Sequence, residues 1–261
     1  MADDIILSTD DVTMRFGGLA AVTDFSIAVK RGAIAGLIGP NGAGKTTCFN
    51  MITGFYKPTT GRILYEGREV SGLAPHKVCK AGIARTFQNI RLFGNETVLE
   101  NVMIGRHLRQ KTGWLQAVFF TPAYLREDKA MRAHCLELLA AVGLADLADD
   151  KANSLAYGAQ RRLEIARALA TDPGFLLLDE PAAGMNPQES EDLMGFVRTI
   201  RDDFNLTILL IEHDMKVVMG ICEHIWVLDY GVTIAQGNPE AIRHDPKVIL
   251  AYLGEEALDH A

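Results

Sequence analysis

The chain has 261 residues, a formal charge of −7 and a pI of about 5.5. Hydrophobic residues make up 48% and charged residues 23%, which is typical of a globular protein and excludes disorder of the whole chain. The acidic balance excludes a global attraction to nucleic acid, the acidic N-terminus argues against a signal peptide, and no apolar run approaches the roughly 20 residues that cross a membrane.

The first third of the chain predicts strands and one helix. Apolar and β-branched residues flank the turn at 16–18, which favours a strand–turn–strand unit. A short apolar run that stops at Gly39 is typical of a buried strand, and a helix that ends at Gly54 follows it. The predicted elements are strands at 5–8, 19–29, 33–38, 61–65 and 83–87 and a helix at 45–53.

The middle of the chain changes character. From 97 to about 144, apolar residues recur at helical spacing, which predicts a helical subdomain. Its least regular part, 107–128, combines aromatic and basic side chains: Trp114, Phe119, Phe120 and Tyr124 with Arg109, Lys111 and Arg126.

In the last third, strands and helices alternate again after Arg161. This alternation predicts a mostly parallel sheet that is covered on both faces. Tyr230 and Gly231 are typical of a hairpin turn. The predicted elements are strands at 175–178, 206–211, 224–229 and 232–236 and helices at 187–202 and 215–222.

Residues 39–46 read GPNGAGKT and match the P-loop pattern GxxxxGK[ST] between a predicted strand and a predicted helix. The glycines allow a tight turn whose N–H groups, with the helix N-terminus, bind phosphate oxygens. Lys45 supplies charge to the outer phosphates, and the Thr46 hydroxyl can ligate Mg²⁺. The alternative, a chance glycine-rich turn, does not explain the flanking elements. The predicted nucleotide-binding residues are Gly39, Pro40, Asn41, Gly42, Ala43, Gly44, Lys45, Thr46 and Thr47.

The second part of the predicted nucleotide site, a pair of carboxylates, directly follows the strand at 175–178. That strand ends in Asp179 and Glu180, at the edge where parallel α/β sheets bind ligands. Asp179 is expected to hold Mg²⁺, directly or through water, and Glu180 to polarise the attacking water. A strand that ends in Asp-Glu is often only a solvated strand end, but the P-loop favours the functional interpretation.

With these motifs, the chain resembles the ATP-binding subunits of ABC transporters over nearly its full length. Four further motifs match in order: Gln88 in ARTFQ (the Q-loop), LAYGAQ at 155–160 (the signature), AGMN at 183–186 (the D-loop) and His213 in LLIEHDM (the switch histidine). Their order separates the chain from kinases and GTPases. The resemblance implies an α/β P-loop NTPase core with a mostly parallel sheet, an antiparallel β subdomain and an α-helical subdomain.

The resemblance also implies roles for side chains. Gln88 would bind Mg²⁺ and sense it for a membrane partner, and His213 would donate to the transferring phosphoryl group; without the resemblance both would be ordinary polar residues. Phe16 would stack on adenine. Asn186 stands where the D-loop usually has aspartate, and the signature departs from LSGGQ at three positions. The residues expected to face the ATP of an opposing subunit are Leu155, Ala156, Tyr157, Gly158, Ala159 and Gln160.

The match is closer still to the larger ATPase subunit of branched-chain amino-acid importers. The segments MRFGGLAAV, SLAYGAQRRLEIARALA, PAAGMNP and DPKVILAYLGE carry it, together with the insert at 107–128. It implies a Mg-dependent ATPase at the cytoplasmic face of a bacterial inner membrane. Its partners would be a second ATPase subunit in a homo- or heterodimer, two permeases and, indirectly, a substrate-binding protein, with no nucleic acid. Related urea, amide or lipopolysaccharide transporters and a soluble ABC ATPase remain alternatives.

One ABC ATPase domain is expected over 1–261. Its core would comprise 1–88 and 172–240, its helical and signature part 89–171, and its tail 241–261. The aromatic residues of the insert have two interpretations: they pack inside the helical subdomain, or they contact a membrane subunit.

Overall fold

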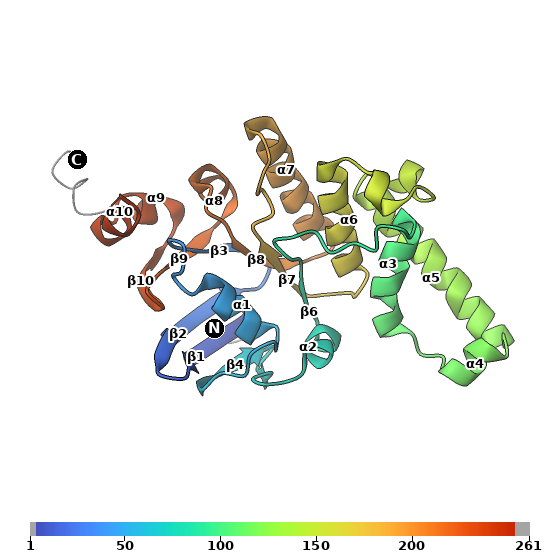
Figure 1. The fold of residues 1–261 in the computed structure, drawn as a ribbon, viewed down its shortest axis with the longest axis horizontal. Coiled ribbons are helices and arrows are strands. Elements are labelled where there is room, and N and C mark those ends of the chain that lie inside the picture. Colours follow the sequence, from blue (N-terminus) through green and yellow to red (C-terminus); the bar gives the residue numbers. More distant parts are fainter. Residues whose placement is uncertain (1–3, 254–261) are drawn as a thin grey trace.

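The computed structural model describes residues 4–253. Figure 1 shows two sheets in one half of the molecule and a group of helices in the other, with the short helix α4 at the far end. Within residues 4–253, no helix combines the length and apolar character needed to span a membrane.

The smaller sheet is antiparallel, as predicted, with strand order β2-β1-β4-β5. A turn at Gly17, whose φ is 58°, joins the first two strands, and the alternating burial along β2 (Leu19–Lys30) places its apolar side chains on one face. The other strands are β1 (Ile5–Phe16), β4 (Thr60–Tyr65) and the unpredicted β5 (Arg68–Glu69).

The larger sheet has the order β10-β9-β3-β8-β7-β6, and all its pairs are parallel except β9 with β10. This confirms the mostly parallel sheet and the hairpin at Tyr230–Gly231. Three central strands are buried throughout, as their continuous apolar runs predict. The strands are β3 (Ile34–Ile38), β6 (Ile83–Arg85), β7 (Phe175–Asp179), β8 (Thr207–Ile211), β9 (His224–Asp229) and β10 (Val232–Gly237).

Each face of the larger sheet belongs to a different hydrophobic cluster. On β7, Phe175 and Leu177 join the cluster formed with the smaller sheet and α1, whereas Leu176 and Leu178 join the cluster formed with the helices. The helices of this half are α1 (Lys45–Ile52), α2 (Pro75–Ala81), α7 (Pro187–Asp203), α8 (Met215–Ile221), α9 (Pro239–Arg243) and α10 (Pro246–Leu253). Because the central strands are parallel, the loops after β3, β7 and β8 meet at one edge.

The helical half is built on α3, which packs against both α5 and α6. At Gly105 the backbones of α3 and α6 come so close that an added Cβ would lie 2.4 Å from the Arg167 carbonyl oxygen. The elements are α3 (Val98–Arg106), η1 (His107–Arg109), α4 (Trp114–Val118), α5 (Pro122–Ala141), η2 (Ala145–Leu147), η3 (Ala152–Ser154) and α6 (Tyr157–Leu169).

The insert meets one expectation and departs from another. It is the least regular part of the helical subdomain, with only the short elements η1 and α4 before α5 begins at Pro122, where Thr121 accepts a hydrogen bond from the Tyr124 N–H. The interpretation that the aromatic side chains pack inside the helical subdomain is wrong: Trp114, Phe119 and Phe120 are 74%, 74% and 67% exposed.

Candidate active site

The P-loop joins β3 to α1 with a backbone that only glycine can adopt at its two ends. Gly39 and Gly44 have φ values of 150° and 103°, and a Cβ at Gly39 would lie 2.0 Å from the Leu228 carbonyl oxygen. Helix α1 then begins at Lys45, with the Cys48 N–H donating to the Gly44 carbonyl. The loop and the helix N-terminus therefore direct N–H groups toward the same space.

Lys45 is 8% exposed and folds back over the loop. Its Nζ donates to the carbonyl oxygens of Gly39 and Pro40 at 2.7 and 2.9 Å. Burial lowers the pKa of Lys45, and the nearby carboxylates of Glu180 and Asp179 oppose that effect. A phosphate group in the loop would give this buried cation an anionic partner in place of two neutral carbonyls.

Small-molecule sites are typically cavities of about 300–1,000 Å³, and one of about 560 Å³ opens over the P-loop. Its walls bring together residues 41–47, Gln88 and Glu180, which are far apart in the sequence. Leu19, Ala20, Ala21 and Tyr230 also line it. The sequence analysis placed these last four residues only in a strand and a turn.

Gln88, Glu180 and His213 meet at one carboxylate oxygen. The Gln88 Nε2 donates to Glu180 Oε2 at 2.7 Å, and His213 Nδ1 lies 3.7 Å from the same oxygen. Glu180 has a φ of 47°, which is rare for a residue with a side chain, and its N–H donates to the Ile211 carbonyl of β8. The backbone after β7 is thus turned so that the carboxylate lies beside the cavity.

Asp179 is 4% exposed, and its carboxylate already has a partner. Arg85 Nη2 donates to Asp179 Oδ2 at 2.5 Å, and Arg85 Nη1 donates to Asn50 Oδ1 at 2.7 Å. The same guanidinium lies over the rings of Phe49 and Phe87. The sequence analysis gave Arg85 no role, although β6 pairs with β7 and brings Arg85 opposite Leu177, two residues before Asp179.

The predicted magnesium ligands fit that ion by chemistry. The Thr46 hydroxyl, the Asp179 carboxylate and the Gln88 amide all offer hard oxygen atoms. Within residues 4–253, no group of three or more His, Cys, Asp or Glu side chains could hold a metal ion. The oxygen atoms of Thr46, Asp179 and Gln88 suit Mg²⁺, which usually binds one or two protein oxygens together with substrate phosphates and water.

Phe16 lies at the end of β1, 43% exposed. It pairs in the strand register with Leu19, which lines the cavity, and its ring makes an edge contact with Tyr56 at a centroid distance of 5.3 Å. The edge contact leaves a π-face for another ring. Adenine stacking on Phe16 stays a prediction.

The signature residues begin α6, away from this cavity. Ala156 is the N-cap of α6 without a side-chain cap, and Tyr157 donates through its hydroxyl to the Ala183 carbonyl at 2.9 Å. Gly158 is exposed, and an added Cβ there would meet nothing within 4 Å. Asn186, unusual in a D-loop, caps α7 by accepting the N–H groups of Gln188 and Glu189. The signature is thus open at the surface.

A buried charge network fastens α6 to the Q-loop. Arg161 is 3% exposed, and its guanidinium donates to the carbonyl oxygens of Phe87 and Gln88 at 2.8 and 2.5 Å. It also pairs with Glu164 at 3.2 Å and donates to the Tyr157 hydroxyl at 3.1 Å. Burial raises the pKa of Glu164, with Arg161 opposing. This network was not predicted; its signal in the sequence is two opposite charges at i and i+3 on a buried helix face.

Glu212 is a second missed residue. It is fully buried, and burial raises the pKa of its carboxyl. Its two oxygens accept the N–H groups of Ala182 and His213 at 2.7 and 3.2 Å. Glu212 therefore joins the loop after β7 to the backbone of His213, and so fixes the segment that presents the histidine.

Comparison with known proteins identifies two families along the chain. Residues 22–183 match the family described as ABC transporter, and residues 232–257 match the family described as branched-chain amino acid ATP-binding cassette transporter. The high-affinity branched-chain amino acid transport ATP-binding protein BraF of Pseudomonas aeruginosa is 49% identical over 96% of this chain and 98% of its own. LivG of Escherichia coli, with the same description, is 48% identical over the same shares.

Solved structures of two similar proteins share the fold. The ADP conformation of MJ1267, an ATP-binding cassette of an ABC transporter, has a TM-score of 0.84 and 34% identity, covering 96% of this chain and 99% of that chain. A dimeric post-hydrolysis state of the cassette MJ0796, bound to ADP and Pi, has a TM-score of 0.73 and 25% identity, covering 89% and 98%.

Proposed function

Because the chain belongs to the ABC transporter family of ATP-binding proteins, we propose that it is the ATP-hydrolysing subunit of a branched-chain amino-acid importer. The observation that carries the hydrolytic role is the convergence of Gln88 and His213 on the carboxylate of Glu180, which lines the P-loop cavity together with Gln88. The substrate class comes from BraF and LivG, the relatives that match nearly the whole chain.

Each side chain at the cavity has a distinct task in this proposal. The P-loop N–H groups and Lys45 bind the phosphates, while Thr46, Asp179 and Gln88 would hold Mg²⁺. When bound, Mg²⁺ neutralises charge on the phosphate oxygens. Glu180 accepts a proton from the attacking water, Gln88 orients Glu180 through their hydrogen bond, and His213 donates to the transferring group.

A second ATPase subunit completes the site. We assign the signature, residues 155–160, to the ATP of that second subunit, because Ala156, Tyr157 and Gly158 are exposed and the segment lies outside the cavity of its own chain. The backbone N–H groups at the start of α6 would bind the anion, since Ala156 has no hydroxyl. The dimeric structure of the MJ0796 cassette, bound to ADP and Pi, supports the pairing of two such subunits.

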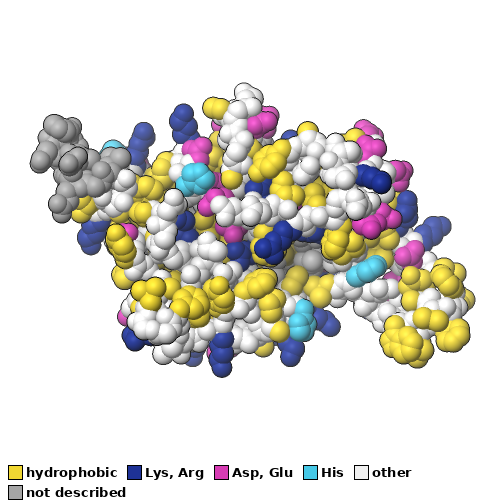
Figure 2. All heavy atoms as spheres, in the orientation of Figure 1, with side chains coloured by type: hydrophobic (Ala, Val, Ile, Leu, Met, Phe, Trp, Pro, Cys, Tyr) yellow, Lys and Arg dark blue, Asp and Glu magenta, His cyan; other side chains and the backbone are white. Residues whose placement is uncertain are grey.

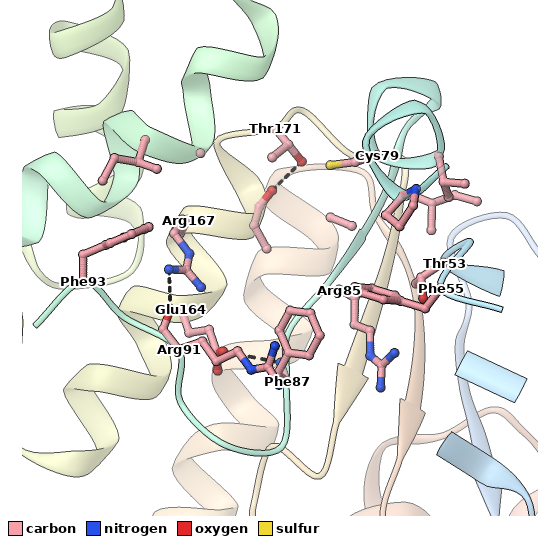
Figure 3. A pocket seen from close by; sticks show the side chains of 17 residues that line it. Thr53, Phe55, Cys79, Arg85, Phe87, Arg91, Phe93, Glu164, Arg167 and Thr171 are labelled. Carbon is pink, nitrogen blue, oxygen red and sulfur yellow. Dashed lines mark hydrogen bonds between the residues drawn. The ribbon is translucent and has the colours of Figure 1, made fainter. Parts of the chain in front are cut away.

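A permease would dock in a groove of about 450 Å³ between α2, the Q-loop and the helical half. Figure 3 shows aromatic side chains of this groove, Phe55, Phe87 and Phe93, together with charged side chains that include Arg91, Glu164 and Arg167. Phe55 and Phe93 are half-exposed and offer apolar contacts. The groove borders the Q-loop, so a segment bound there would act on Gln88 and the active site. The subunit would then work at the cytoplasmic face of the membrane.

Substitution of Glu180 tests the hydrolytic role. Glu180→Gln should keep ATP binding but slow single-turnover hydrolysis by about 10²–10⁴-fold, because the amide accepts no proton. Lys45→Ala is the matched control, and it should instead weaken binding by about tenfold or more. Unchanged hydrolysis in Glu180→Gln would remove Glu180 from the role of base.

The docking groove has its own test in Cys79, a free thiol that lines it and is only partly buried. Assembly with the permease should protect Cys79 from a maleimide, whereas Arg91→Glu should restore labelling and uncouple hydrolysis from transport. Rapid Cys79 labelling in a fully assembled, transporting complex would exclude this groove as the dock. The permease that co-purifies, and the solute it transports, tests the substrate class.

A further inference from the structure

The far end of the helical half carries a group of exposed apolar side chains, which we name the apolar knob. Figure 2 shows it as a yellow cluster at the end of the molecule remote from the C-terminus. Its six members, each between 52% and 74% exposed, are Trp114, Leu115, Val118, Phe119, Phe120 and Leu125. A contiguous apolar surface of this kind marks an interaction site, because contact with water is unfavourable.

Hydrogen bonds hold the knob in place on the helical half. The Glu127 carboxylate accepts the N–H groups of Lys111 and Thr112 at 2.8 and 2.9 Å. Arg109 donates to the carbonyl oxygens of Thr171 and Lys80 at 2.7 and 3.1 Å. The base of the knob is therefore fixed to two separate parts of the chain, and its apolar side chains project beyond them.

The base of the knob adjoins the groove proposed for the permease. Arg109 binds the carbonyls of Lys80 and Thr171, and Thr171 itself lines the groove together with Cys79, the residue before Lys80. The orientation of the knob therefore rests on the proposed function. A permease segment in the groove comes from the membrane, so the knob lies on the side of the molecule that faces the bilayer.

The chemistry of the knob matches a bilayer surface. Tryptophan and phenylalanine are favoured at the membrane interface, and apolar side chains bordered by basic residues are typical of interfacial helices. Residues 107–129 carry four basic and two acidic side chains, a net charge of +2, whereas the whole chain has a charge of −7. Anionic lipid headgroups attract such a basic segment. We propose that the knob inserts its apolar side chains into the headgroup region of an anionic bilayer and so anchors the ATPase beside its permease.

Tryptophan fluorescence gives a direct test, because Trp114 is 74% exposed and Trp226 only 2%. With the full chain, vesicles of phosphatidylcholine and phosphatidylglycerol should shift the Trp114 emission to shorter wavelength. Lipids brominated in their acyl chains should quench it. High salt or pure phosphatidylcholine should weaken both effects. The Trp226→Phe variant leaves Trp114 as the only tryptophan, so that its emission reports on the knob alone.

A double substitution tests the apolar contact. Val118→Ser with Phe119→Ser keeps Trp114 and should lower vesicle affinity by about tenfold or more. Leu136→Ser is the matched control, because Leu136 is an exposed apolar residue of α5 outside the knob. Because all three positions are exposed, the variants should fold, as circular dichroism would verify.

Two results would overturn the proposal. One is a Trp114 emission that no anionic vesicle changes. The other is a photo-crosslinker at position 119 that reaches a permease rather than lipid in the assembled transporter, which would assign the knob to a protein partner. Failure of the proposed function would give a different result, because ATP hydrolysis and permease binding would be absent. Vesicle binding by the isolated chain requires neither of these activities, so the two failures can be distinguished.

Discussion

The buried network between α6 and the Q-loop makes a quantitative prediction for Arg161→Met. Arg161 and Glu164 have side chains that are 4% and 2% exposed, so methionine would leave the Glu164 charge buried without its partner. Breaking a buried ion pair in this way costs about 3–5 kcal/mol. The Phe87 and Gln88 carbonyls also lose their donor, which is consistent with the upper part of that range.

The loss should show a characteristic pH dependence. Burial raises the pKa of Glu164 in the folded protein, and Arg161 opposes that rise, so Arg161→Met should raise the pKa further. A carboxyl with a raised folded pKa favours the folded state below its unfolded pKa and loses that contribution as pH rises through the folded value. The stability deficit of the variant should therefore be larger at pH 8 than at pH 5.

Urea denaturation of a double-mutant cycle measures these effects. Arg161→Met should lower the free energy of unfolding by about 4 kcal/mol, equivalent to a fall in Tm of about 10 °C. Adding Glu164→Gln should recover about half of this loss, because the amide removes the buried charge and still accepts the Phe87 N–H. A loss below about 1 kcal/mol, equal at both pH values and unchanged by Glu164→Gln, would refute the network as a structural link.

Two further predictions concern the signature. Ala156→Ser should raise Tm by about 2–4 °C in differential scanning calorimetry, because a serine N-cap can accept an N–H at the start of α6, worth about 1 kcal/mol; an unchanged Tm would exclude this capping. Gly158→Asp should leave the isolated subunit folded and able to bind ATP, since its Cβ meets nothing within 4 Å, yet abolish hydrolysis by the assembled complex through repulsion of the γ-phosphate. Normal turnover in that variant would show that the signature faces no ATP.

The sequence predicted the central strands because their residues are apolar on both faces. Strands β3, β7 and β8 lie within one residue of the predicted bounds, since nothing but a buried sheet accommodates such runs. Helices α2 and α10 were missed, because each is too short for a clear period and neither follows a buried central strand, as the equally short α1 and α8 do. Short helices depend on packing that the local sequence does not encode.

The insert shows the limit of hydrophobic pattern reasoning. Its aromatic residues suggested burial as one interpretation, yet Trp114 and Phe119 are exposed. Apolar side chains in a sequence indicate surface that is more stable when it is removed from water. They do not indicate whether the same chain or another molecule buries that surface. The structure places the insert at the outer end of the helical half, where no other part of the described chain buries these side chains.

The same limit applies to the active site. A motif predicts residues that touch a ligand, so the sequence pointed to Lys45, Gln88 and Glu180, which line one cavity. Arg85 was not predicted, because its partner Asp179 is 94 residues away in the sequence and only the fold brings the two together. Arg161 likewise reaches the Gln88 carbonyl, 73 residues away, and only its pairing with Glu164 at i and i+3 left a local signal.

These two arginines fasten the Q-loop at opposite ends. Arg85, on β6, ties the strand that leads into the loop to Asp179 in the sheet, whereas Arg161, on α6, holds the carbonyls of Phe87 and Gln88 from the helical half. Residues 86–88 link Arg85 to the two carbonyls that Arg161 holds. If the helical half moves relative to the sheet, the backbone over these residues must take up the displacement, because a buried ion pair is costly to break. Gln88 is the last of them and donates to Glu180, so such a movement would directly reach the carboxylate proposed as the base.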